Sequence, residues 1–92
     1  MNKTVLLTGV TGHIGLPLAK RLIIEGFRVI GVSRNPVSDD ELTSSSSYIH
    51  ICENLDCYDG IYRLIEKLEG IEMPIDYLIN NARSASHYEF KG

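Results

Sequence analysis

The fold of this chain is decided by residues 4–15, whose sequence is TVLLTGVTGHIG. Its first four residues form a short, almost wholly apolar run, which is typical of a strand buried on both faces of a parallel sheet. Glycines follow at positions 9, 12 and 15. From Ile14 to Phe27 apolar residues then recur four positions apart, which predicts an amphipathic helix capped by Gly26. A buried strand, a glycine-rich turn and a helix therefore follow one another at the start of the chain.

The alternation of strands and helices continues along the chain. The pattern predicts further strands at Arg28–Ser33, Tyr48–Cys52 and Ile75–Ile79, and a helix around Leu64, Ile65 and Leu68 that closes at Gly70. Asn35–Ser47 is polar and is expected to be a surface loop, with a short helix capped by Ser38. Strands that alternate with helices pair in parallel through right-handed crossovers. We therefore predict an α/β fold, a Rossmann-like doubly wound parallel sheet in the strand order 3-2-1-4 with helices on both faces.

Length and composition limit the functions that this chain can have. The chain has 92 residues, of which 43% are hydrophobic and 23% charged, and its formal net charge is -3. This size allows one small domain. The chain has no basic run, which argues against nucleic acid and anionic membranes as partners. Cys52 and Cys57 have no His cluster at zinc-ligand spacing, so no metal site is predicted. Without a membrane-length apolar run or a signal peptide, we expect a cytoplasmic protein.

The glycine-rich turn carries the clearest chemical signal. In such a motif the first glycine permits a tight turn, the second lets the backbone approach a pyrophosphate, and the third lets helix and strand pack closely. The N-terminus of the following helix directs free N–H groups and the positive end of its dipole at the phosphates. We therefore predict a dinucleotide site here. The alternative is an ordinary strand-to-helix turn that contains three glycines.

The end of the second predicted strand indicates which dinucleotide binds. An acid there accepts a hydrogen bond from the 2′-hydroxyl of the ribose in NAD, whereas a cation favours the 2′-phosphate of NADP. The chain has Ser33-Arg34-Asn35 at this place and no carboxylate before Asp39. We therefore predict that Arg34 favours NADP(H), with NAD as the alternative. The other interpretation is that Arg34 is a solvated loop residue.

These motifs resemble those of the short-chain dehydrogenase/reductase superfamily, and the resemblance covers almost the whole chain. The turn has the TGxxGxxG spacing of the extended branch, which includes sugar-nucleotide epimerases and dehydratases. Asn80-Asn81-Ala82 resembles the NNAG motif of the compact branch of reductases, and Arg83 replaces its glycine. The resemblance implies that the NNA segment lines the cofactor ribose. It also implies that Asn54 and Leu55 meet the adenine ring, with Asn54 in place of the usual acid.

The family's catalytic pair does not occur in this chain. The resemblance implies a tyrosine with a lysine four residues later, which carry out acid–base catalysis coupled to hydride transfer from the nicotinamide. The nearest spacing is that of Tyr88 and Lys91, which are three residues apart. In the family this pair lies far beyond the fourth strand. We therefore predict no catalytic residue here, and we expect the chain to be truncated relative to a full-length enzyme.

The predicted cofactor-binding residues all lie near the ends of predicted strands. They are Gly9, Thr11, Gly12, His13, Ile14, Gly15, Arg34, Asn54, Leu55, Asn80 and Ala82. His13, at the start of the helix, could help balance the charge of the pyrophosphate, and the alternative is that it is a plain residue of the helix start.

Residues 1–92 are accordingly predicted to form a single NAD(P)-binding domain. Our hypothesis is the NADP(H)-binding N-terminal part of a short-chain dehydrogenase/reductase, an oxidoreductase that transfers hydride between a carbonyl and an alcohol in its complete form. The alternatives are a fragment of an NAD-dependent sugar-nucleotide epimerase or dehydratase, and a non-catalytic dinucleotide-binding module. The small-molecule substrate is unknown. An unpaired edge strand and uncovered apolar helices further predict self-association or low stability of the isolated chain.

Overall fold

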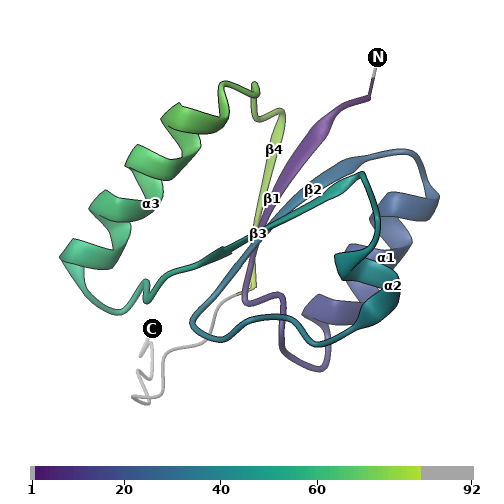
Figure 1. Ribbon diagram of the computed structural model, residues 1–92, viewed down its shortest axis with the longest axis horizontal. Helices are drawn as coiled ribbons and strands as arrows, with labels where there is room; N and C mark the ends of the chain where they lie inside the picture. The colour runs from purple at the N-terminus through teal and green to yellow at the C-terminus, as the bar shows by residue number, and fades with distance from the viewer. Residues whose placement is uncertain (1, 82–92) are drawn as a thin grey trace, which may run out of the picture.

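The computed structural model describes residues 2–81, which form a parallel sheet between two layers of helices. The strands are β1 (Thr4–Thr8), β2 (Arg28–Ser33), β3 (Tyr48–Cys52) and β4 (Tyr77–Asn80), and the helices are α1 (Gly15–Ile24), α2 (Asp40–Thr43) and α3 (Tyr58–Ile71). All strand pairs are parallel, in the order β3-β2-β1-β4. Helices α1 and α2 lie on one side of the sheet and α3 on the other (Figure 1). The predicted Rossmann-like fold is confirmed.

The core lies on both faces of β1 and β2. All five residues of β1 are buried, as are the last five of β2. Alternate residues of a strand point to opposite faces of the sheet. Leu7 accordingly packs in the cluster beneath α1 and α2, whereas Leu6 packs with Leu64 of α3. The apolar run of β1 predicted a strand that is buried on both faces, and both β1 and β2 are covered on both faces.

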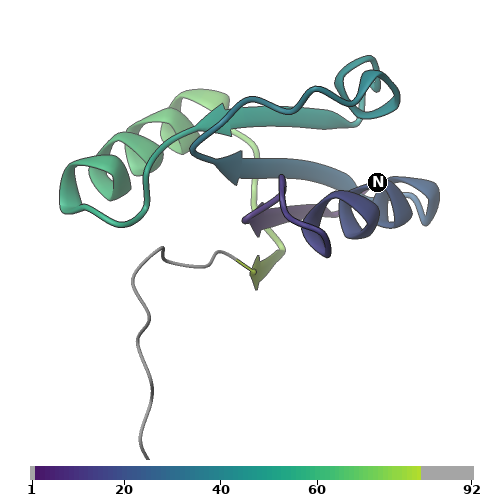
Figure 2. The same cartoon turned by 90° about the horizontal axis from the view of Figure 1, so that it is seen from below.

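The fourth strand lies at the edge of this sheet. Figure 2 shows the strands side by side, with α3 nearer to β3 and β2 than to β4. Leu78 is consequently 64% exposed, although its register partner Leu6 is buried. On α3, Ile61 and Ile65 are also exposed. Within residues 2–81, this side of the molecule therefore presents apolar side chains to solvent.

Helix α1 begins one residue later than predicted. Ile14 precedes the helix, and its side chain is 65% exposed. The prediction that Ile14 belongs to the helix's buried stripe was wrong, because the chain is still crossing the glycine turn at this residue. At its C-terminal end the helix stops at Ile24. Gly26, the predicted cap, follows with a φ of 96°.

The short helix α2 is capped by Asp39, not by Ser38 as predicted. The Leu42 N–H donates to Asp39 Oδ1 at 3.2 Å. The other carboxylate oxygen of Asp39 pairs with Lys20 Nζ of α1 at 2.5 Å. The lysine is the physical reason for the difference, because a carboxylate can cap α2 and pair with α1 at once, whereas a serine hydroxyl cannot.

The predicted limits of the last two elements were also inexact. Helix α3 passes through Gly70 and ends at Ile71, and the C-cap residue Glu72 follows with a left-handed φ of 56°. The strand begins at Tyr77, because Asp76 forms the preceding contacts with β1: its N–H donates to the Thr4 carbonyl, and its carboxylate accepts from the Thr4 N–H. On α3, Leu64 is buried in the core, whereas Ile65 is 47% exposed. No helix within residues 2–81 is long and apolar enough to cross a membrane.

Candidate functional site

The turn after β1 brings backbone close to backbone. Gly9 has a φ of 69°, and its N–H donates to the Val32 carbonyl of β2 at 2.8 Å. A β-carbon at Gly15 would lie 2.2 Å from the Gly9 carbonyl oxygen. No larger residue fits there without a shift of the backbone, so the third glycine serves close packing of α1 against the turn.

The start of α1 is open to an anion. Thr11, Gly12 and His13 are exposed. Within the part of the chain that the structure describes, no side chain caps α1, and its first turn holds no acidic residue. The Leu16 N–H donates to the Gly12 carbonyl at 3.2 Å and Pro17 has no N–H, so what this end of α1 offers an anion is mainly the positive end of the helix dipole, with no competing carboxylate in that turn.

Arg34 follows the buried end of β2. Ser33 is buried, whereas Arg34 and Asn35 are exposed. Among residues 2–81 the Arg34 guanidinium forms no ion pair or hydrogen bond, in contrast to Arg28 and Arg63. Its charge is available to an anionic ligand.

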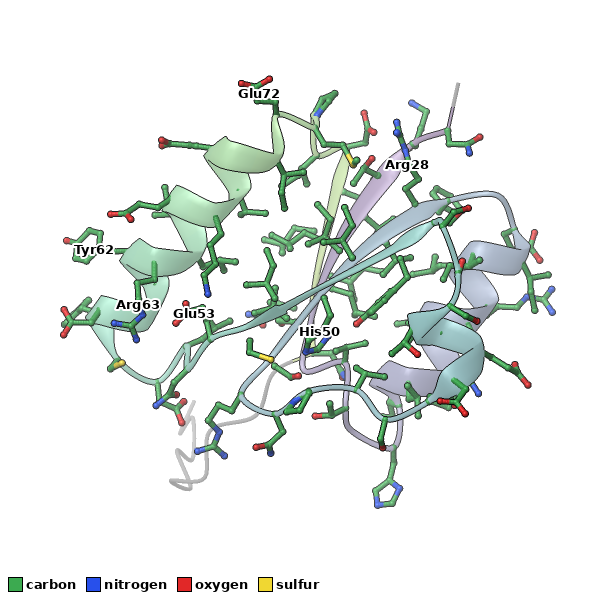
Figure 3. The ribbon with its side chains drawn as sticks, viewed as in Figure 1. Arg28, His50, Glu53, Tyr62, Arg63 and Glu72 are labelled. Carbon is green, nitrogen blue, oxygen red and sulfur yellow. The ribbon has the colours of Figure 1, made fainter. Side chains whose placement is uncertain are left out.

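A buried carboxylate follows β3. Glu53 is 8% exposed, and it pairs with two cations of α3, Arg63 Nε at 2.9 Å and Lys67 Nζ at 2.5 Å. Figure 3 shows the Glu53 and Arg63 side chains directed toward one another between β3 and α3. The hydrogen bonds from Lys67 and then Arg63 lower the pKa of Glu53. The carboxylate is therefore held ionised at the wall of the site.

Glu53 was missed by the sequence analysis. The signal that could have found it is an acid directly after a strand, followed by Arg63 and Lys67 at a four-residue spacing on the next helix. The same loop contains Asn54, whose carbonyl oxygen would lie 1.7 Å from a β-carbon at Gly60. Helix α3 thus holds the Glu53–Leu55 segment by ion pairs and by close backbone packing.

Hydrogen bonds join the end of β4 to the glycine turn. Thr8 Oγ1 donates to Asn80 Oδ1 at 2.7 Å and accepts from the Asn81 N–H at 3.0 Å. The Asn81 side-chain amide donates to the Gly9 carbonyl at 3.4 Å. The asparagines thereby fix the end of β4 to the first glycine. Ala82 lies outside the described residues.

These loops enclose a cavity of about 370 Å³ at the carboxyl edge of the sheet. Eight of the predicted residues line it: Gly9, Thr11, Gly12, His13, Ile14, Arg34, Asn54 and Leu55. Gly15 and Asn80 do not, since Gly15 packs beneath the turn and Asn80 bonds to Thr8. The other lining residues are Val32, Ser33, Glu53, Asp56 and Asn81, of which only Asn81, as part of the NNA segment, was expected near the cofactor. Within residues 2–81 no group of His, Cys, Asp and Glu could hold a metal ion.

A cavity at this place suits a nucleotide. In open parallel sheets, ligands bind outside the carboxyl ends of the strands, where the strand order reverses. Here the order reverses between β1 and β4, next to the glycine turn. The cavity offers an uncapped helix start for phosphates, a cation beyond β2, and the Asn54 amide with the apolar Leu55 for a base.

Comparison with known proteins supports this assignment. The family model described as short chain dehydrogenase matches residues 3–91. A 3-oxoacyl-[acyl-carrier-protein] reductase FabG of Buchnera aphidicola subsp. Acyrthosiphon pisum is 33% identical over 85 residues, which cover 87% of this chain and 34% of that protein.

Solved structures agree. A short chain dehydrogenase from Leptospira borgpetersenii with bound NAD+ is 28% identical with a TM-score of 0.81, over 98% of this chain and 35% of that one. An actinorhodin polyketide ketoreductase with NADPH is 27% identical with a TM-score of 0.69, over 88% and 33% of the two chains. The chain thus spans about a third of the length of these relatives. From its fold, its glycine turn and the family match, we conclude that the chain belongs to the short-chain dehydrogenase family.

Proposed function

We propose that this chain is the NADP(H)-binding N-terminal part of an oxidoreductase that transfers hydride between a carbonyl and an alcohol. The observation that carries the proposal is the cavity that joins the glycine turn, Arg34 and the Asn54-Leu55 segment. A nicotinamide dinucleotide is the expected ligand, because the relatives include structures with NAD+ and with NADPH.

The residues present fit the adenosine and pyrophosphate parts of such a cofactor. Gly9 and Gly12 would let the pyrophosphate approach the backbone, and the start of α1 would stabilise its charge. Asn54 would accept from the adenine amino group, with Leu55 against the ring. Arg34 would pair with the 2′-phosphate, since within residues 2–81 it is the one Lys or Arg that lines the cavity. When bound, the cofactor supplies the hydride chemistry.

Two alternatives stay open to test. The TGxxGxxG spacing favours an NAD-dependent sugar-nucleotide epimerase or dehydratase. The other alternative is a non-catalytic dinucleotide-binding module. The gene sequence downstream of codon 92 distinguishes them, because an enzyme of this family requires the pair to follow. The cytoplasmic location stays a prediction.

The cofactor assignment is tested by the fluorescence of bound NADPH and NADH. We expect tighter binding of NADPH, and Arg34→Ala should weaken it about tenfold, as for the loss of one charge-assisted hydrogen bond, with little effect on NADH. Arg21→Ala is the matched control, because Arg21 is an exposed arginine of α1 that pairs with Glu25 and does not line the cavity. Equal or tighter binding of NADH by the unmodified chain would contradict the NADP assignment.

We also propose that the isolated chain self-associates through the apolar surface formed by Ile61, Ile65 and Leu78. All three side chains are more than a third exposed, and they lie beside an edge strand. Light scattering should give a mass above 10.3 kDa, and Leu78→Lys should restore the monomer. The conservative control is Leu78→Ile, which keeps the surface apolar. A monomeric unmodified chain at high concentration would refute this proposal.

A further inference from the structure

At position 31 of β2 only a glycine fits, because the Tyr48 side chain of β3 occupies the space beside it. A β-carbon there would come within 2.1 Å of the Tyr48 hydroxyl oxygen. Gly31 and His50 are register partners on the two strands, and Tyr48 lies two residues before His50 on the same face. The missing side chain therefore leaves the space in which the Tyr48 hydroxyl reaches His50.

His50 joins this buried tyrosine to the end of β2. Tyr48 is 9% exposed, and its hydroxyl lies 2.7 Å from His50 Nδ1. On the other side of the ring, His50 Nε2 lies 3.1 Å from the Asn35 carbonyl oxygen and 3.2 Å from Ser33 Oγ. The Ser33 hydroxyl in turn donates to the Asn35 carbonyl at 2.6 Å.

The partners decide the tautomer of the histidine. A carbonyl oxygen only accepts hydrogen bonds, so Nε2 must carry the proton that it donates to Asn35. Nδ1 then accepts from the Tyr48 hydroxyl, and the ring is neutral. Burial lowers the pKa of His50, which favours the same neutral form. The Tyr48 hydroxyl thus donates to His50, and His50 donates to the Asn35 carbonyl, which also accepts from the Ser33 hydroxyl.

This chain of hydrogen bonds holds the residues on either side of Arg34. Ser33 and Asn35 are both bonded to His50, while the Arg34 side chain has no partner within residues 2–81 and lines the cavity. Fixing the two neighbours fixes the backbone from which the guanidinium extends. Less conformational freedom is then lost when Arg34 binds an anion.

We propose that His50, oriented by Tyr48, is a positioning residue that sets the preference of this site for a 2′-phosphorylated dinucleotide over its unphosphorylated form. The inference rests on the proposed role of Arg34 and deepens it. His50 does not line the cavity and acts only through the Ser33–Asn35 segment. Its loss should therefore affect the part of affinity that depends on the 2′-phosphate.

The test measures the ratio of NADPH to NADH affinity of the 92-residue chain by cofactor fluorescence. His50→Leu should lower this ratio about tenfold, the effect of losing a hydrogen-bonding group that orients a charged one, while NADH affinity stays nearly unchanged. His50→Gln should keep most of the ratio, because its amide can still donate to the Asn35 carbonyl. NADH binding by each variant also reports that it is folded.

A second pair of variants removes only a hydroxyl. Tyr48→Phe should lower the ratio, though less than His50→Leu. Tyr62→Phe is its matched control, since Tyr62 is 64% exposed on α3 and far from His50 (Figure 3). This pair decides the question if His50→Leu does not fold.

The outcomes separate the two proposals. An unmodified chain without a preference for NADPH overturns the cofactor assignment, and with it the role of His50. A preference that is lost in Arg34→Ala but unchanged in His50→Leu or Tyr48→Phe overturns the role of His50 alone. Equal losses of NADPH and NADH affinity would also overturn it, because they indicate a general structural effect.

Discussion

Strands β1 and β4 are neighbours in the same sheet, yet they differ in burial and in the elements that pack against them. All of β1 is buried, whereas three of the four residues of β4 are exposed. Strand β1 has a parallel partner on each side and helices against both faces. Within residues 2–81, β4 pairs only with β1, and α3 lies over the other strands. The comparison shows that the burial of an apolar strand residue depends on the elements around it as much as on its own sequence.

The two regions therefore contribute differently to the stability of the fold. Packing in the region of β1, β2 and the loops at their carboxyl ends stabilises the fold. The region of β4 is attached mainly by its ladder to β1 and by the bonds of Thr8 and Asp76. Three sets of substitutions test this distinction.

The largest contrast should come from two leucines one register position apart. Leu7→Ala should lower the free energy of unfolding by about 2–5 kcal/mol, because Leu7 is fully buried and its loss leaves a cavity. Leu78→Ala should change it by no more than about 0.5 kcal/mol, since Leu78 is 64% exposed. Urea unfolding followed by circular dichroism measures both values. Similar losses in the two variants would mean that β4 is as well packed as β1.

The second contrast lies within α3. Gly60→Ala should destabilise the fold by about 1–3 kcal/mol, because the new methyl group meets the Asn54 carbonyl and must displace backbone. Gly70→Ala meets no atom within 4 Å and should stabilise the helix by up to about 1 kcal/mol. Thermal unfolding of the two single variants gives the comparison. If Gly60→Ala were neutral, the loop after β3 would not be the tightly packed segment described above.

The smallest effect should come from the hydroxyl that joins the two regions. Thr8→Val removes the group that bonds to Asn80 and Asn81, which should cost about 1 kcal/mol. Faster hydrogen exchange at the Asn81 amide should accompany the loss. Thr8→Ser keeps the hydroxyl and should retain the protection of that amide. Unchanged exchange in Thr8→Val would show that the strand ladder alone fixes β4.

The fold could be predicted from the sequence because its signals are local. The apolar runs of β1 and β2 and the stripe on α1 follow directly from residue order. The strand order was then predicted from the doubly wound fold to which such an alternation belongs. The ends of elements were less predictable, since they depend on partners distant in sequence. Asp39 caps α2 because it can also pair with Lys20, and β4 begins at Tyr77 because Asp76 bonds to Thr4.

The candidate site was predictable in part for the same reason. The glycine turn and Arg34 stand next to strands in a recognisable order, and they line the cavity. His50 and Glu53 could not be assigned in this way. A histidine inside a strand has no local sign of what its ring meets, and the partners of Glu53 lie 10 and 14 residues further along the chain. Both depend on how strand and helix come together.

The pairing of Glu53 has a consequence for the electrostatic field of the cavity. A carboxylate in its wall would by itself repel a ligand that carries several phosphate charges. Here one negative charge is accompanied by two positive ones, those of Arg63 and Lys67. The two cations therefore offset the repulsion that Glu53 alone would exert on the phosphates, although Asp56 is a second acid in the same wall. Because salt screens such close, partly buried pairs less than it screens distant charges, this compensation should persist as the ionic strength rises.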